Sequence, residues 1–313
     1  MSSLEAPTLS NKILDGLQNQ KILGLVKETL AEDLQTFHTP DANTLANLTL
    51  SRLLDAGESY PLAAQTLALE VYPNWKGIDV RKLYHQYNWD VERKGSADNA
   101  TPHIQGKSLL DIGGGPGTFS LEVLKIRPEL QISIADIHDW RKEEAKSNPS
   151  ISYQPLSIGG KLPVKDKSFD SGSLLYVLHH VETDHEEFLK ECARCLTSTL
   201  ILFEDVMVNS EQALPKRGFR SVRDLEEKFL KLSLSEQNEF IAVVDYICNH
   251  IASRELSMPV PGKYYEFTEL KEKLQRQFPK AEVQAHFHGI YDTKCYPNPE
   301  AMYVVNFNKE VKK

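Results

Sequence analysis

The feature that most constrains the fold is the glycine-rich loop at residues 111–117, which read DIGGGPG. The short apolar run before it, residues 108–112, is typical of a buried strand, and residues 118–126 have helical spacing of apolar side chains. Glycines at such a junction let the backbone turn sharply and approach a ligand closely. The order strand, glycine loop, helix therefore predicts a βα unit with a ligand site at its turn.

The same alternation of strands and helices continues towards the C-terminus. Further strands are expected at residues 131–136, 151–153, 169–176, 199–203, 281–290 and 301–307. Strands that alternate with helices predict an α/β fold with a parallel, doubly wound sheet. The last two strands flank a Tyr-Pro-Asn-Pro turn at residues 296–299, so an antiparallel hairpin is expected at the end.

The first part of the chain has a different pattern. Apolar periodicity predicts helices at about residues 13–34, 45–54, 62–71 and 80–91, and no convincing strand precedes residue 106. Residues 95–101, which are small and polar, indicate a boundary, and residues 211–275 again look helical. We therefore expect an N-terminal helical region at residues 1–100, and a domain at residues 101–313 with a helical cap at residues 211–275.

Composition excludes several classes of function. The 313 residues include 36 Lys and Arg against 44 Asp and Glu, a net charge of −8, which argues against a surface devoted to nucleic acid or anionic membrane. No apolar run approaches the ~20 residues of a membrane helix, and no secretory signal is visible. With four Cys and no signal, a reduced, cytoplasmic location is expected.

The glycine pattern discriminates between two nucleotide cofactors. A dinucleotide fingerprint needs glycine at its first, third and sixth positions, and no register of this loop provides all three. Instead an acid, Asp111, precedes the glycines, and a carboxylate there suits a cationic group such as the amino group of a methionine moiety. A second acid, Asp136, ends the next predicted strand, where it can accept hydrogen bonds from ribose hydroxyls.

Residues 109–117 resemble motif I of the class I S-adenosylmethionine-dependent methyltransferases. The resemblance continues through Asp136 and through residues 162–170 and 174–181, and it looks like the branch that includes quinone-biosynthesis and many natural-product enzymes. It implies a Rossmann-like, seven-stranded, mostly parallel sheet with an antiparallel last strand. It also implies that S-adenosylmethionine is the cofactor and S-adenosylhomocysteine the product. The cofactor site that it implies comprises Asp111, Gly113, Gly114, Gly115, Gly117, Asp136, Ile137, Ser157 and Tyr176.

The chain departs from the family where relatives usually carry an acid that contacts the adenine amine. The corresponding residues 153–158 contain no acid, so the adenine contact is expected to fall to Ser157 or to the backbone.

Two pairs of residues at predicted strand ends are candidates for chemistry. His179 and His180 follow the fourth strand, and a histidine there can remove a proton from the acceptor. The alternative is that this pair only starts the next helix. Glu204 and Asp205 end the fifth strand and are candidates for substrate contact, unless they merely cap a helix.

Three further groups of residues have simpler interpretations. Tyr265 is a candidate for the substrate pocket, although a core or surface role for it is the plainer reading. The histidines near Asp184 lack the partners of a known metal site, so no metal is expected. Cys192 and Cys195 lie late in a predicted helix and are expected to be buried thiols.

The sequence thus predicts S-adenosylmethionine-dependent methyl transfer to a small organic molecule, at oxygen or carbon. Two alternatives stay open: a methyltransferase fold that performs cyclisation or elimination, and a regulatory module with a degenerate cofactor site. An RNA substrate is disfavoured by the acidic balance. Lone N-terminal helical regions in such enzymes often form dimers, so a homodimer is also expected.

Overall fold

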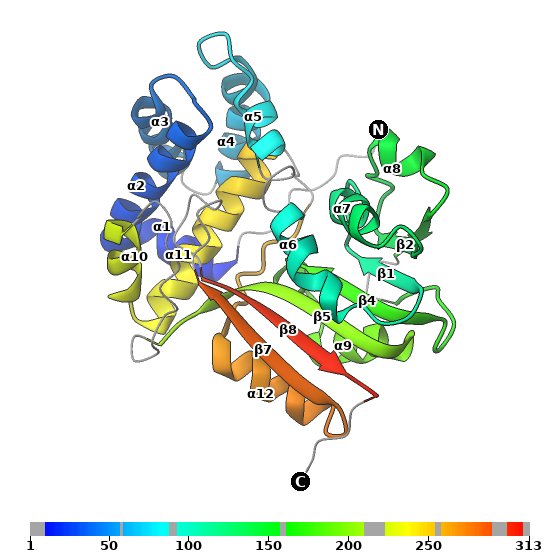
Figure 1. Cartoon of the computed structure of the whole chain (residues 1–313). Coiled ribbons are helices and arrows are strands. Elements are labelled where there is room, and N and C mark those ends of the chain that lie inside the picture. Colours follow the sequence, from blue (N-terminus) through cyan, green and yellow to red (C-terminus); the bar gives the residue numbers. More distant parts are fainter. Residues whose placement is uncertain are drawn as a thin grey trace. The chain divides into compact units, whose positions relative to one another are not determined.

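The computed structural model describes residues 10–56, 59–87, 93–156, 161–209, 223–253, 258–289 and 299–308. The chain divides into two compact units, each built from separate stretches of sequence (Figure 1). The helical unit comprises Met1–Asn88, Met207–Tyr264 and Gly289–Pro299. The sheet unit comprises Trp89–Val206, Tyr265–His288 and Glu300–Lys313.

The sheet unit contains the predicted α/β sheet. Its strands are β1 (Ser108–Ile112), β2 (Gln131–Asp136), β3 (Ile151–Pro155), β4 (Phe169–Leu175), β5 (Leu196–Met207), β6 (Tyr265–Glu266), β7 (Glu282–Gly289) and β8 (Glu300–Asn306). Their order is β3-β2-β1-β4-β5-β8-β7, and β6 also pairs with β5. The first five strands pair in parallel, whereas β8 runs antiparallel to β5. The expected Rossmann-like sheet with an antiparallel C-terminal strand is confirmed.

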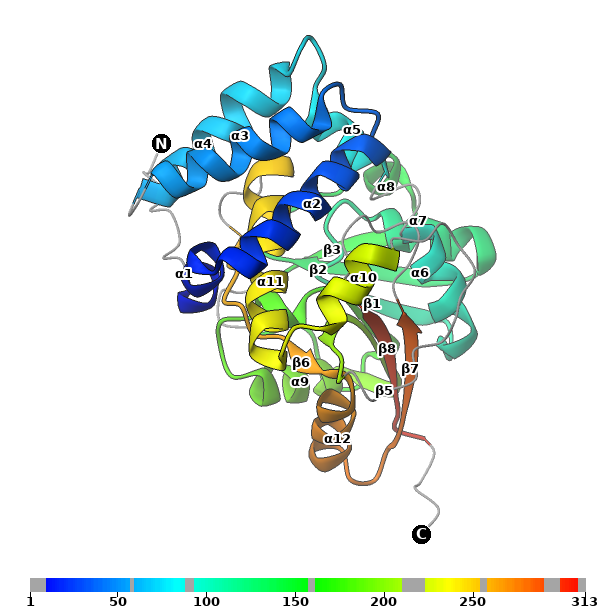
Figure 2. The ribbon, with the colours of Figure 1, turned by 90° about the vertical axis from the view of Figure 1, so that its left-hand side faces the viewer.

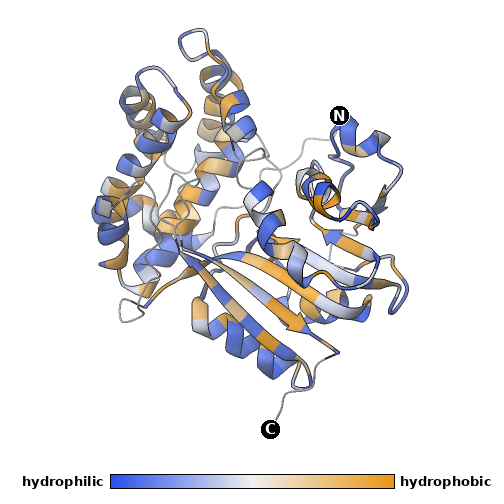
Figure 3. Cartoon of the chain, viewed as in Figure 1, coloured by the Kyte–Doolittle hydropathy of each residue, from blue (hydrophilic) through white to orange (hydrophobic). Residues whose placement is uncertain are grey.

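Helices cover both faces of this sheet (Figures 1 and 2). On one face lie α6 (Arg93–Ala100), α7 (Thr118–Ile126) and α8 (Glu143–Ser147); on the other lie α9 (His185–Arg194) and α12 (Phe267–Gln277). Successive residues of β1 enter different cores, since Leu109 packs with the first group and Leu110 with the second. Burial on both faces explains why the middle of a central strand such as β5 reads as a short apolar run, which is orange in Figure 3.

Helix α6 occupies the stretch that its small residues marked as a boundary. Ala97 and Ala100 are fully buried in the core that α7 also contributes to. Their lack of bulky side chains lets α6 pack closely, and the Thr101 hydroxyl donates a hydrogen bond to the Ala97 carbonyl at 2.6 Å. The small residues at this position therefore serve packing within the sheet unit.

The helical unit has its own hydrophobic core. Its helices are α1 (Asn11–Gln18), α2 (Gln20–Thr36), α3 (Ala42–Asp55), α4 (Tyr60–Thr66), α5 (Val80–Tyr87), α10 (Arg223–Leu230) and α11 (Leu234–Ile247), with shorter helical turns at η2 (Leu67–Val71), η3 (Tyr72–Asn74) and η7 (Cys248–Ala252). Helix α11 begins with a capping box between Ser233 and Glu236. Among the described residues, none of the helices has the length and hydropathy that a membrane crossing requires.

Two helical glycines of this unit differ in their surroundings, and this difference makes a prediction. A Cβ atom at Gly16 would lie 2.7 Å from Val243 Cγ2 and 3.0 Å from the Glu239 carbonyl, whereas one at Gly24 would meet nothing within 4 Å. We expect Gly16→Ala to destabilise the protein by about 1–3 kcal/mol through overpacking. Gly24→Ala should instead stabilise it by roughly 0.5–1 kcal/mol through helix propensity. Denaturant unfolding followed by circular dichroism checks both, and a stabilising Gly16→Ala would contradict the close packing of α1 on α11.

Candidate functional site

The glycine loop joins β1 to α7 and has the conformation that the sequence indicates. Gly113, Gly115 and Gly117 all have positive φ angles, of 70°, 50° and 78°. A Cβ atom at Gly113 would lie only 2.4 Å from Val177 Cγ2, so this loop lies directly against the segment that follows β4. A Cβ atom at Gly115 would meet nothing within 4 Å, so the space beside the middle of the loop is open. The loop is thus close to protein on one side and accessible on the other.

Asp111 lies beneath the loop at the end of β1 and is only 1% exposed. Its Oδ1 accepts a hydrogen bond from the Ser173 hydroxyl at 2.9 Å, and its Oδ2 accepts one from the Ser120 hydroxyl at 2.7 Å. Burial raises the pKa of this carboxyl to about 6, although the two hydroxyls and the charge of Arg93 oppose the rise. Each oxygen accepts one of these hydrogen bonds and keeps a second lone pair, so the burial of the side chain is what limits a direct bond to a ligand.

Asp136 ends β2 at the same edge of the sheet. Its Oδ2 accepts a hydrogen bond from the Gly115 backbone N–H at 2.9 Å, which ties the acid to the middle of the loop. Burial raises the pKa of Asp136, and hydrogen bonds from backbone N–H groups act against that rise. The two predicted acids, Asp111 and Asp136, therefore flank the glycine loop.

An apolar rim follows Asp136. Ile137 is 41% exposed and Trp140 is 50% exposed, which is unusual for large hydrophobic residues. The Trp140 ring packs edge-on against His138, with the ring centroids 5.3 Å apart. Ile137 was among the predicted cofactor residues, whereas Trp140 was missed. The signal that could have indicated it is a tryptophan in an otherwise polar segment just after a strand end.

Tyr176 follows β4 with a strained backbone, since its φ angle is +58° in a residue other than glycine. Its N–H donates to the Phe203 carbonyl at 2.8 Å, and its hydroxyl donates to Glu300 Oε1 at 2.6 Å. The guanidinium of Arg93 lies over its ring, 4.6 Å from the centroid. Arg93 was not predicted because the segment around it read as a boundary.

His179 and Glu204 form a buried pair, although His179 follows β4 and Glu204 lies on β5. His179 Nδ1 lies 2.6 Å from Glu204 Oε2, and both side chains are 3–4% exposed. The other oxygen of Glu204 accepts hydrogen bonds from the backbone N–H groups of Val177 and Leu178, at 3.2 and 2.8 Å. Glu204 therefore holds both the loop after β4 and the imidazole that this loop carries. Since an ionised carboxylate only accepts, the neutral imidazole carries its proton on Nδ1.

The remaining predicted residues lie as follows. The His180 ring is 4.1 Å from the His179 ring, centroid to centroid. Asp205 is buried on β5, directly opposite Glu300 of β8. The Tyr265 hydroxyl lies 2.8 Å from His185 Nδ1, which anchors that side chain. Ser157 lies outside the described residues.

Cys192 and Cys195 are fully buried thiols, as predicted. Burial raises the pKa of both groups, which keeps them protonated and unreactive at neutral pH.

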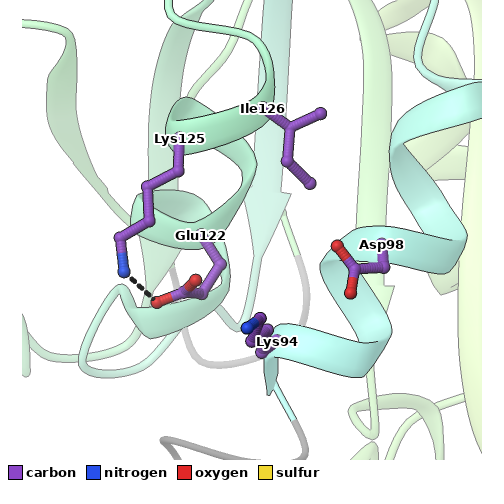
Figure 4. Close-up of a pocket in the computed structure, with 5 residues that line it drawn as sticks. All are labelled: Lys94, Asp98, Glu122, Lys125 and Ile126. Atoms are coloured by element: carbon purple, nitrogen blue, oxygen red, sulfur yellow. Dashed lines mark hydrogen bonds and ion pairs between the residues drawn. The ribbon is translucent and has the colours of Figure 1, made fainter.

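A separate groove lies between α6 and α7 on the sheet unit (Figure 4). It is lined by Lys94, Asp98, Glu122, Lys125 and Ile126. Lys125 pairs with Glu122 at 2.5 Å, and the charges that line the groove are two of each sign. Because the positive and negative side chains are equal in number and two of them pair with each other, the groove favours neither an anionic nor a cationic ligand.

Comparisons with known proteins agree with the site. A family model described as a methyltransferase domain matches residues 110–202. No curated protein matches the sequence. A solved methyltransferase from Aquifex aeolicus, described as S-adenosylmethionine-dependent, is 12% identical, over 73% of this chain and 96% of its own, with a TM-score of 0.44. The plantazolicin methyltransferase BpumL, solved with S-adenosylhomocysteine, is also 12% identical, over 84% of this chain and 97% of its own, with a TM-score of 0.43. Because both scores are below 0.5, the assignment rests on the family match and on the site itself.

The matched residues contain the end of β1, the glycine loop, Asp136 and the segment after β4. They fit the cofactor of this family, because the space beside Gly115 is open and a carboxylate flanks the loop on each side. Residues 110–202 thus match a methyltransferase domain, and their glycine loop with its two acids fits S-adenosylmethionine as the cofactor.

Proposed function

We propose that this enzyme methylates a small organic molecule at oxygen or carbon, with His179 as the base that removes the acceptor's proton. The observation that carries the proposal is the contact between Gly113 and Val177, because it brings the residues after β4 against the loop that binds the cofactor. The buried pair of His179 and Glu204 stands two residues beyond that contact. A prepared base beside the cofactor loop is what an acceptor with an ionisable proton requires.

Each part of the loop region has a role in binding the cofactor under this proposal. Asp136 accepts hydrogen bonds from the ribose hydroxyls, and the glycines let the backbone approach the methionine part. Ile137, with Trp140 nearby, offers apolar surface to the adenine ring, and Ser157 stays a predicted contact to its polar edge. Asp111 attracts the amino group from beneath the loop through its negative charge. S-adenosylmethionine supplies a methyl group that is already activated, so these residues contribute mainly by alignment.

The proton on the acceptor is removed by the His179–Glu204 pair. With Nδ1–H donating to Glu204, Nε2 is the nitrogen that accepts the proton, and the ring becomes an imidazolium. The carboxylate at 2.6 Å stabilises that positive charge as it forms. Asp205 and Tyr265 stay predicted substrate contacts. A cytoplasmic location, a homodimer and a lid made by the helical regions are likewise predictions from the sequence.

Two measurements on the purified chain test the proposal. Isothermal titration should show binding of S-adenosylmethionine and S-adenosylhomocysteine, and turnover with phenols, carboxylic acids and activated carbon acids should release S-adenosylhomocysteine. Turnover of an acceptor without release of that product would indicate cyclisation or elimination. Binding without turnover across the acceptor panel would favour the regulatory module, and no heat at millimolar ligand would contradict the cofactor site.

His179→Ala should leave the affinity for S-adenosylhomocysteine unchanged and lower kcat by about 10²–10⁴-fold, because it removes the base. Single-turnover kinetics with the best acceptor measures the effect. His103→Ala, which removes an imidazole elsewhere on the sheet unit, is the matched control and should retain full activity. A larger loss in His180→Ala than in His179→Ala would transfer the role to His180.

Glu204→Gln should lower kcat by roughly 10–100-fold with little change in cofactor affinity. An amide has only one acceptor oxygen, so either the His179 Nδ1–H group or the backbone N–H groups of Val177 and Leu178 lose their acceptor. The imidazolium also loses its neighbouring negative charge, so the pKa of the base falls and the acidic limb of the kcat profile moves to lower pH. The pH dependence of kcat measures both effects. An unchanged profile would leave Glu204 with only the structural role of holding residues 177 and 178.

Asp111→Asn should weaken cofactor binding but stabilise the fold. A carboxyl whose folded pKa is raised binds its proton more tightly when folded, so its contribution to stability falls as pH rises from about 4 to about 6. Removing it should therefore stabilise the protein at pH 7.5, by on the order of 3 kcal/mol, and by much less at pH 4.5.

Asp170→Asn is the matched control, and its expected effect on stability at neutral pH is opposite to that of Asp111→Asn. The pKa of Asp170 is lowered, chiefly by the hydrogen bond from the Lys107 N–H, so its stabilising effect is present at neutral pH and lost in acid. This variant should be less stable than the wild type at pH 7.5 and also at pH 4.5, because both values lie above the ordinary pKa of an aspartate, and the gap should close only in stronger acid. Thermal unfolding at both pH values distinguishes the two, and equal destabilisation by both variants would contradict the burial argument.

A further inference from the structure

The hydrogen bond between Tyr176 and Glu300 joins the end of β4 to the start of β8, two strands that are not neighbours in the sheet. Glu300 is the first residue of β8 and is only 2% exposed. Its Oε1 accepts from the Tyr176 hydroxyl at 2.6 Å, a length typical of a hydroxyl that donates to a carboxylate. The proton transfer proposed for His179 does not involve this bond, so its role is a separate question.

Tyr176 is held in a backbone conformation that a bulky residue rarely adopts. Its φ angle is +58°, in the left-handed region that is costly for side chains other than glycine. Its N–H donates to the Phe203 carbonyl at 2.8 Å, and the Arg93 guanidinium lies 4.6 Å from the centre of its ring. A side chain that is also fixed at its hydroxyl end restricts the rotation of the backbone to which it is attached. The bond to Glu300 therefore helps to keep the strained turn.

The turn at Tyr176 determines where the next residues lie. Val177 follows directly, and a Cβ atom at Gly113 would be 2.4 Å from its Cγ2, so the two segments are in close contact. His179 comes two positions later, in the same short loop. If Tyr176 took the negative φ angle that most residues adopt, the chain would leave β4 in another direction and would move His179 with it.

Glu300 and Glu204 hold this loop from opposite faces of the sheet. Side chains alternate along a strand, so Glu300 shares its face of β8 with Met302, whereas Glu204 shares its face of β5 with Leu202. Met302 belongs to the core that contains α6 and α7, and Leu202 belongs to the core that contains α9 and α12. One carboxylate accepts from the side chain of Tyr176, and the other accepts from the backbone N–H groups that follow it.

We propose that Glu300 is a positioning residue for the base. Through the Tyr176 hydroxyl it keeps the loop after β4 in the strained conformation that brings His179 to the cofactor loop. The inference rests on the proposed role of His179 and adds a residue from the last strand that acts on it at a distance. A positioning role changes the rate of transfer in the folded protein, whereas a purely structural role changes its stability alone.

The experiment breaks the bond from each side. Tyr176→Phe removes the donor, Glu300→Leu removes the acceptor, and Glu300→Gln keeps one acceptor oxygen. The double variant Tyr176→Phe with Glu300→Leu tests whether the two losses are one. The matched control is Tyr72→Phe, which removes another tyrosine hydroxyl, buried in the core of the helical unit and 3.0 Å from Thr49 Oγ1. Single-turnover kinetics with the best acceptor, at saturating S-adenosylmethionine, measures the rate of transfer.

Tyr176→Phe and Glu300→Leu should each lower the single-turnover rate by about 10–100-fold. The double variant should be no slower than either single variant, because both changes break the same bond. Glu300→Gln should stay within about threefold of the wild-type rate, since its amide oxygen still accepts from the hydroxyl. Tyr72→Phe should match the wild-type rate.

Nitrogen-15 NMR of the histidine side chains gives a second measurement, which needs no acceptor. The ring of His179 should show its proton on Nδ1, hydrogen-bonded to Glu204, and His179→Ala identifies the signal. This signal should shift or broaden in Tyr176→Phe and in Glu300→Leu, because the loop that carries the ring is no longer fixed. It should be unchanged in Glu300→Gln and in Tyr72→Phe.

Two results would overturn the inference. Wild-type rates and an unchanged His179 signal in both Tyr176→Phe and Glu300→Leu, with a change only in thermal unfolding, would reduce the bond to a structural role. A slower Tyr176→Phe beside an unaffected Glu300→Leu would show that the hydroxyl acts on the acceptor itself.

Failure of the inference can be distinguished from failure of the proposed function. If the wild-type chain transfers no methyl group to any acceptor, the proposed function fails, and the His179 signal alone decides whether Glu300 positions the ring. If Glu300→Leu does not fold, the same signal in Tyr176→Phe decides.

Discussion

The site depends on one buried carboxylate under a glycine loop. Asp111 is held by hydroxyls from two elements, Ser120 on α7 and Ser173 on β4. It thus joins three pieces of the sheet unit at the point where the loop turns. Burial makes its ionised form costly, as its raised pKa shows, and the loop above it leaves no room for a side chain at Gly114, whose Cβ atom would lie 2.6 Å from Asp111 Oδ2. Gly114 is therefore required by the acid beneath it.

A second carboxylate organises the neighbouring strand ends in the same way. Glu204 uses one oxygen for two backbone N–H groups after β4 and the other for His179. The sequence suggested that Glu204 contacts a substrate, and in the structure both of its oxygens take part in hydrogen bonds within the protein. Acids at the ends of parallel strands position the loops before anything binds, which is the preorganisation that alignment-driven chemistry needs.

Much of the site could be predicted because it is local in sequence. The glycine loop, Asp111 and Asp136 follow from strand periodicity and from the spacing of acids and glycines, since a few consecutive residues dictate a βα turn. Arg93 and Trp140 could not be found in this way. Arg93 lies over the ring of Tyr176, a residue far along the chain, and the small residues of α6 that allow its packing indicated a boundary in the sequence. The pairing of His179 with Glu204 was likewise hidden, because it depends on β4 and β5 being neighbours.

The sequence by itself determined the class of fold, the cofactor loop and the two acids that flank it, because periodicity and turn chemistry act over a few residues at a time. Only the tertiary structure decided which polar groups form hydrogen bonds with one another and which keep an unused donor or acceptor. Burial and hydrogen bonding depend on partners brought together from distant strands. For that reason the structure shows that Glu204 forms a hydrogen bond with His179, and that Arg93 Nη1 is buried with no acceptor among the described residues.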